Sequence, residues 1–179
     1  MAKNWKIRKD LSIEVCGHTL FRIECTQDFK EIKAGTLGGF IEKEENLDGN
    51  AWVSGNAKVY GNALVSDDAQ VYGNAKVYGN ALVCGKAWVY DDAQVYGDKI
   101  TNKDDICYIS NRYYNITITP LHIKIGCQYH AQESWWNFTD EQIEKMDGES
   151  ALNFWKIWKE PLKQICDAMK KEKGEKDVK

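Results

Sequence analysis

Aromatic, amide and lysine side chains recur at one fixed interval, eighteen positions, in the middle of the chain. The residues in these series are Trp52, Gln70, Trp88, Tyr72, Tyr90, Lys58 and Lys76. Aromatic rings stack on planar bases, and ammonium groups attract anions. If the fold brings the series together, they would suit a nucleotide or another planar anionic ligand. The alternative is that the tyrosines cover corners of the fold and the lysines keep its surface soluble.

Acid–base and metal chemistry has few candidates. The histidines are His18, His122 and His130, and Cys127 precedes His130 by three positions. Together with His122 they give three candidate zinc ligands on segments expected to be strands, which is a weak signal for a zinc site. We therefore predict no catalytic residue, no metal site and no cofactor.

Two acidic pairs, Asp67–Asp68 and Asp91–Asp92, raise the possibility of a calcium site. Their offset is six positions longer than the interval of the aromatic series, so the pairs belong to different corners of the fold. Hard cations need several converging oxygen ligands. Turn formation by aspartate is the favoured interpretation.

A six-residue repeat generates the longer interval. From Asn50 the chain reads NAWVSG, NAKVYG, NALVSD and DAQVYG, and four similar units follow. In an α-helix successive valines would rotate by about 240° around the axis. In a strand, Ala and Val two positions apart point to the same side. Three short strands and three Gly, Asn or Asp corners then close one coil, and the third residue of each unit points outward.

This pattern resembles the hexapeptide-repeat left-handed parallel β-helix, in which an aliphatic residue is followed four places later by a small one, as at Val53 and Ala57. It departs from that family after each valine, where this chain mostly has tyrosine. The expected fold is mainly β. Its parts are an N-terminal β cap at 1–37, the β-helix at 38–98, a small β-sheet cap at 99–131, and C-terminal helices with a charged tail at 132–179.

Two leucines, Leu64 and Leu82, fall on one face of the expected coils. Stacked outward leucines are best explained by a partner surface. Since hexapeptide β-helices usually assemble as trimers, the resemblance implies a homotrimer contact here. Isolated apolar residues are also normal on protein surfaces, which is the alternative.

Aromatic residues are concentrated after the expected sheet. We predict that they pack between helices and sheet, or form a second oligomer contact. Thr139 and Gln142 have the spacing of a helix-capping box, and Pro161 is expected to begin the last helix. The aromatic residues are Trp135, Trp136, Phe138, Phe154, Trp155 and Trp158.

Composition narrows the expected environment. A net charge of -3 and a pI near 5.7 give no electrostatic reason to bind long nucleic acid. No apolar run approaches the roughly 20 residues that cross a bilayer. The six cysteines include no CxxC pair, so we expect a cytoplasmic protein with buried, reduced thiols and no membrane partner.

The order of motifs also resembles a group of uncharacterised phage and prophage proteins. The shared segments read TLFRIECTQDF, LGGFIEKEENL and IKIGCQYH. That resemblance implies a phage-encoded protein acting in the host cytoplasm, and it brings no established activity.

Three function classes are weighed. The first is a non-catalytic oligomer that sequesters a small, anionic, nucleotide-like signal of host defence. The second is a hexapeptide-repeat acyltransferase, in which the family uses a histidine as general base. The third is a structural trimer, or one that binds a host protein. Because no histidine lies within 38–98, the enzyme fits less well than the binding protein.

Overall fold

The computed structural model describes residues 3–176, with side chains described as far as residue 171. The chain divides into two compact units, Met1–Tyr108 and Ile109–Lys179. No helix in the described part of the chain is long and apolar enough to span a membrane.

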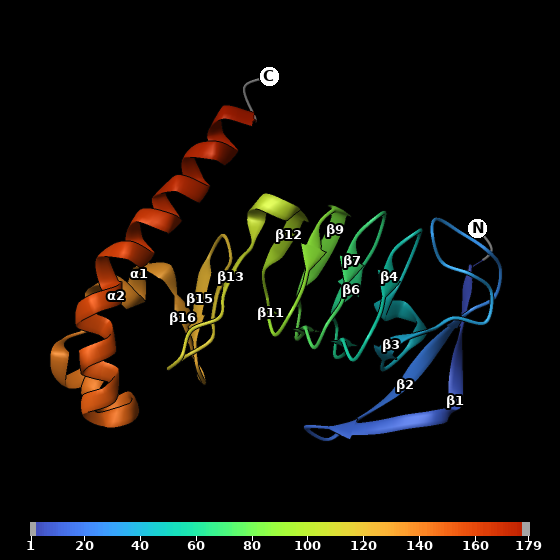
Figure 1. The fold of residues 1–179 in the computed structure, drawn as a ribbon, viewed down its shortest axis with the longest axis horizontal. Helices are drawn as coiled ribbons and strands as arrows, with labels where there is room; N and C mark the ends of the chain where they lie inside the picture. Colours follow the sequence, from blue (N-terminus) through green and yellow to red (C-terminus); the bar gives the residue numbers. More distant parts are fainter. Residues whose placement is uncertain (1–2, 177–179) are drawn as a thin grey trace. The chain divides into compact units, whose positions relative to one another are not determined.

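A parallel β-solenoid with three faces forms most of the first unit (Figure 1). The first face consists of β4 (Trp52–Val53), β7 (Gln70–Val71) and β10 (Trp88–Val89). The second contains β3 (Leu37–Ile41), β5 (Lys58–Val59), β8 (Lys76–Tyr78) and β11 (Gln94–Tyr96). The third consists of β6 (Leu64–Val65), β9 (Leu82–Lys86) and β12 (Lys99–Asn102). Each face thus contains strands from successive coils, as the repeat interval predicts.

Valine and alanine fill the interior of the solenoid. Val53, Val71 and Val89 are direct partners in the first face, and all three are fully buried. The repeat alanines are equally buried. The prediction of a mainly β, repeat-built parallel coil is therefore confirmed, because the six-residue period places residues of the same size above one another.

Parallel pairing continues past the point where the sequence period breaks. In β12, Lys99 pairs with Leu82 and Ile100 pairs with Val83, so the offset is one residue shorter than in the preceding coils. Ile100 is fully buried and takes the place of the repeat valine. A corner shortened by one residue is thus absorbed without losing the interior column. The 3-10 helix η2 (Lys103–Asp105) and strand β13 (Cys107–Ile109) follow.

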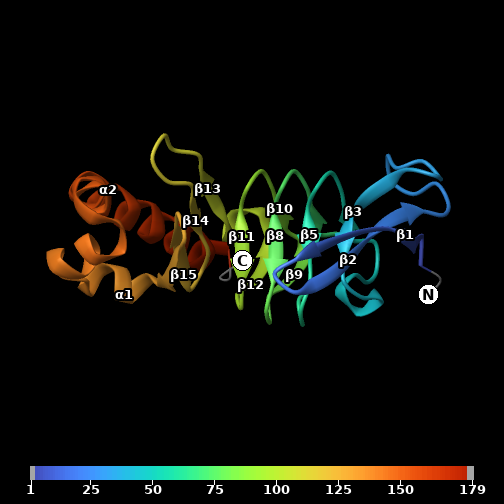
Figure 2. The ribbon, with the colours of Figure 1, turned by 90° about the horizontal axis from the view of Figure 1, so that it is seen from below.

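An N-terminal hairpin extends the second face into a six-stranded sheet. Its strands β1 (Trp5–Val15) and β2 (His18–Cys25) are antiparallel, and β2 pairs with β3. Figure 2 shows the hairpin running along the solenoid. Near its tip, Leu20 packs against Phe40 and Tyr60. The hairpin therefore covers part of the outer surface. The 3-10 helix η1 (Glu44–Asn46) follows β3.

In the second unit, an antiparallel sheet packs against two helices. The strands of this sheet that lie wholly in the second unit are β14 (Ile116–Ile118), β15 (His122–Ile125) and β16 (Gln128–Ala131). The helices are α1 (Gln132–Asn137) and α2 (Asp140–Lys176). Trp135, Phe154 and Trp155 are buried, and the Trp135 indole N–H donates to the Ile123 carbonyl at 2.8 Å. The predicted aromatic packing between helices and sheet is confirmed for these three residues, whereas Trp136, Phe138 and Trp158 are half-buried.

The ends of α2 follow the sequence only in part. The capping box is present: the Thr139 N–H donates to the Gln142 side chain at 2.9 Å, and the Gln142 N–H donates to the Thr139 hydroxyl at 3.3 Å. The prediction for Pro161 is wrong, because this residue lies inside α2. The interruption is instead at Asp147 and Gly148, where Gly148 has φ of 63°. Glycine adopts that conformation without strain, so the helix changes direction there.

The prediction of buried thiols is right for Cys25 and Cys166 and wrong for Cys16 and Cys127, which are exposed. Cys16 lies in the turn between β1 and β2, with φ of 50°, and Cys127 lies in the turn between β15 and β16. Turns are exposed because their backbone groups need water. Cys84 and Cys107 are half-buried, and no disulfide joins any of the six cysteines in the described part of the chain.

Candidate functional site

The first face of the solenoid stacks the outward residues as expected. Gln70 lies between Trp52 and Trp88 in the parallel ladder. The two tryptophans nevertheless have different surroundings, with exposed fractions of 6% for Trp52 and 43% for Trp88. One end of the column is therefore closed and the other is open.

A loop between β2 and β3 closes the Trp52 end. The ring of Phe29 meets the Trp52 ring edge-on, with centroids 5.6 Å apart. Phe29 also forms a bridge with Ile32, which orders the loop. Trp52 thus belongs to the core, and the β2–β3 loop covers the surface at which a ligand was predicted.

At the open end, Trp88 lines a groove of about 480 Å³ within the first unit. Ligand pockets generally measure about 300 to 1,000 Å³. The groove is therefore large enough for a small organic ligand. Its lining residues are Lys30, Asp68, Gln70, Lys86, Trp88, Asn102, Lys103 and Asp104.

Charges in the groove are mixed with a cationic excess. Lys30 forms an ion pair with Asp68 at 3.1 Å and donates to the Asn50 carbonyl at 2.8 Å. Lys86 and Lys103 supply two further ammonium groups, against one more carboxylate from Asp104. The lining therefore carries three formal positive charges and two negative ones. Such a surface attracts a small anion while offering hydrogen-bond acceptors to its neutral part.

Only two of the predicted ligand-binding residues, Gln70 and Trp88, line this groove. Tyr72 and Tyr90 stack on one another at 5.9 Å on the neighbouring corner, and burial raises the pKa of both phenols.

On the second face, Lys58 donates to the Asn56 carbonyl at 2.8 Å. Burial and then the charge of Lys76 lower the pKa of Lys58. The seven predicted residues form the expected columns. Of these columns, the groove includes only the Gln70 and Trp88 part of the tryptophan column.

The sequence contains a signal for part of the missing lining. Asn50, Asp68 and Lys86 follow one another at the same interval as the tryptophan series, so they form the corner column beside the tryptophan face. In the last coil the interval shortens, and Asn102 is the register partner of Lys86. Lys30 and Lys103 have no such signal, because they come from a loop and from η2.

The histidines lie elsewhere. The His18 Nδ1 is 2.8 Å from a Glu42 carboxylate oxygen, and its ring lies 5.2 Å from that of Tyr60. His122 stacks on Tyr129 at 4.7 Å. His130 packs edge-on against two aromatic rings, and burial lowers its pKa. Over the part of the chain that the structure describes, no three His, Cys, Asp or Glu side chains converge as a metal site.

The two acidic pairs, Asp67–Asp68 and Asp91–Asp92, lie at corners of the solenoid. Asp67 and Asp91 have φ of 57° and 53°, the conformation that glycine adopts at the equivalent corners. The Asp67 carboxylate accepts a hydrogen bond from the Gly85 N–H of the next coil at 2.9 Å. Turn formation thus accounts for these residues.

A family model described as the YdcK beta solenoid repeat matches residues 57–73, 69–85 and 75–91. The first unit carries a β-solenoid repeat. These matches fall within the coils between β4 and β11, so the similarity concerns the repeat and not the flanking segments. No curated protein matches the sequence.

The third face of the β-solenoid holds the two leucines side by side. Leu64 and Leu82 are direct partners in the ladder between β6 and β9. Both side chains are half-buried. They form a narrow apolar column on the surface of the described unit.

Proposed function

We propose that the first unit binds a small anionic ligand with a planar base, without converting it, in the groove at Trp88. One combination of features supports this proposal: an exposed indole ring lies beside three lysines in a groove of about 480 Å³. Indole rings stack on any base, and lysine pairs with phosphate as a point charge.

Six of the eight lining residues have a role in this proposal. Trp88 stacks on the base, and Lys86 and Lys103 pair with the anionic groups. The Gln70 amide offers both a donor and acceptors to the base edge. Asp68 and Asp104 accept hydrogen bonds from amino groups of the base and disfavour ligands that consist of phosphate alone.

Sequestration is the biological role that this binding would serve. A sequestering protein needs affinity and no catalytic group. The resemblance to phage proteins suggests that the ligand is a nucleotide-like signal of host defence. The histidines, on which the acyltransferase alternative depends, lie outside the groove lining.

The first experiment identifies the ligand and measures its affinity. Small molecules released from the purified protein by heat are identified by mass spectrometry, and the unmodified nucleotide is then titrated calorimetrically. Trp88→Ala is expected to weaken binding by roughly 5- to 150-fold, because losing one base-stacking ring costs about 1–3 kcal/mol. Tyr96→Ala removes a ring of similar exposure that does not line the groove, and it should leave the affinity unchanged.

Other outcomes would redirect the proposal. Equal affinities of wild type and Trp88→Ala would remove the groove as the binding site. Turnover of acetyl-coenzyme A would favour the acyltransferase. A host protein that co-purifies in place of a nucleotide would favour a protein-binding scaffold.

We further propose a homotrimer held through Leu64 and Leu82. Their adjacency in the ladder supports this assembly, because a self-associating face needs contiguous apolar surface.

Leu64→Glu combined with Leu82→Glu is expected to reduce the mass in light scattering to that of a single chain, since a buried, unpaired carboxylate is strongly unfavourable. Lys58→Glu with Lys76→Glu places acids on the second face and should leave the mass unchanged. A mass unaffected by the leucine changes would exclude this face.

A further inference from the structure

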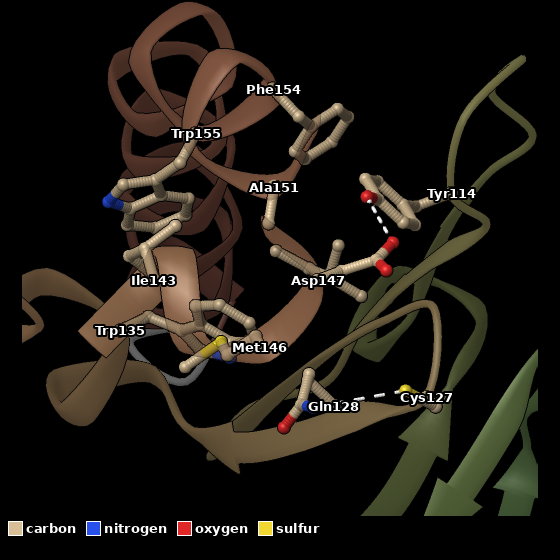
Figure 3. A pocket seen from close by; sticks show the side chains of 11 residues that line it. Tyr114, Cys127, Gln128, Trp135, Ile143, Met146, Asp147, Ala151, Phe154 and Trp155 are labelled. Atoms are coloured by element: carbon tan, nitrogen blue, oxygen red, sulfur yellow. Dashed lines mark hydrogen bonds between the residues drawn. The ribbon is translucent and has the colours of Figure 1, made fainter. Parts of the chain in front are cut away.

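The second unit contains a pocket of different character. It is a cavity of about 50 Å³, lined mainly by apolar side chains of α1 and α2 and by Ile125 of β15, with Cys127 and Gln128 beside them. Figure 3 shows Ile143, Met146 and Trp135 on one side, with Ala151 and Phe154 across from them. The space therefore accepts a short apolar group and excludes a large one.

A carboxylate lies at the edge of this pocket. The interruption of α2 brings Asp147 opposite Tyr114, whose hydroxyl donates to an Asp147 carboxylate oxygen at 2.7 Å (Figure 3). Burial, and then this hydrogen bond, raise the pKa of Tyr114 to about 12. The phenol therefore stays protonated at neutral pH and orients the carboxylate.

Aromatic faces complete the surroundings of that carboxylate. Tyr114 and Phe154 meet edge-to-face with centroids 5.0 Å apart, and both rings line the pocket. Ring faces attract cations, and the attraction grows where water is excluded. The Asp147 carboxylate, which is exposed, adds the modest Coulomb attraction of an ion pair at the protein surface. The edge of the pocket thus favours positive charge, and its interior favours hydrocarbon.

We propose that this pocket binds a small organic cation, an amine with a short alkyl body, whose ammonium pairs with Asp147 and whose chain enters the apolar interior. The site is separate from the groove at Trp88 and does not depend on the function proposed for that groove. A neutral molecule of the same shape gains only the apolar contact, so discrimination between the two measures the contribution of Asp147.

The test uses butylammonium and butanol as matched probes. The full-length protein is labelled with ¹³C-methyl methionine, because Met146 lines the pocket and Met169 does not. Butylammonium is expected to shift the Met146 methyl signal in a saturable way and to leave that of Met169 in place. Its dissociation constant should be about fivefold lower than that of butanol, as expected for an ion pair at the protein surface.

Two variants separate charge from shape. Asp147→Asn should make the two probes bind equally, whereas Glu149→Gln, which removes the same charge two residues away and outside the lining, should keep the preference. Ala151→Leu should fill the cavity and abolish both titrations. If that variant does not fold, the ratio measured with Asp147→Asn still decides. Absence of a saturable Met146 shift with butylammonium, or equal binding of both probes to the wild type, overturns the proposal.

Discussion

Trp135→Ala is expected to lower the free energy of unfolding of the second unit by about 3–5 kcal/mol, the usual cost of truncating a buried tryptophan. Trp135 is only 2% exposed. Its ring contacts those of Phe138 and Trp155 at 5.6 and 5.3 Å. Its indole N–H also satisfies the Ile123 carbonyl on β15. The change removes a large apolar volume and leaves a buried carbonyl without its donor, and both effects are destabilising.

Urea unfolding followed by far-ultraviolet circular dichroism at the helix band is the measurement, because α1 and α2 both belong to the second unit. Ile157→Ala is the control. Ile157 is on the same helix and is 70% exposed, so its truncation should change the stability by less than about 0.5 kcal/mol. Similar losses for the two variants would show that the aromatic cluster does not form the core of this unit.

The solenoid could be predicted from the sequence because its repeat places equal residues in contact. Val59 meets Val77, and Val77 meets Val95, in direct register. A period of six residues is incompatible with one face of a helix, and it fits strands separated by corners. Here the local pattern and the long-range contact carry the same information.

The groove could be predicted only in part, because some of its lining residues come from segments outside the repeat. Phe29 covers Trp52, and Lys30 reaches Asp68 from the same loop. Both contacts depend on how the β2–β3 connection folds back, which no periodicity encodes. The repeat interval therefore predicted that Trp52, Gln70 and Trp88 form one column. It did not predict that Trp52 is buried.

The interruption of α2 illustrates the same point at the level of one residue. Proline is a strong signal for a helix start, yet Pro161 continues the helix, whose next residue, Leu162, is fully buried. The actual break occurs at Asp147 and Gly148. Packing of the apolar face decides where the helix continues, and it outweighs the loss of one backbone hydrogen bond.

Gly73→Ala is expected to destabilise the solenoid by about 2–5 kcal/mol, the sum of a conformational and a steric cost. Gly73 has φ of 72°, and a Cβ at this position would lie 2.9 Å from both the N and the O of Asp91 in the next coil. The left-handed conformation costs a non-glycine residue about 1–2 kcal/mol. The clash with backbone adds about 1–3 kcal/mol, because a main-chain atom cannot move aside as a flexible side chain does.

Gly97→Ala separates these two costs. Gly97 has nearly the same φ, 73°, but no atom lies within 4 Å of the position that a Cβ would take. Its substitution should therefore cost only the conformational part, about 1–2 kcal/mol. Urea unfolding followed by circular dichroism at the β-sheet band gives both values. If the two variants lose the same stability, the coils can separate by a few tenths of an ångström without cost, and the close stacking at Gly73 does not limit the stability of the solenoid.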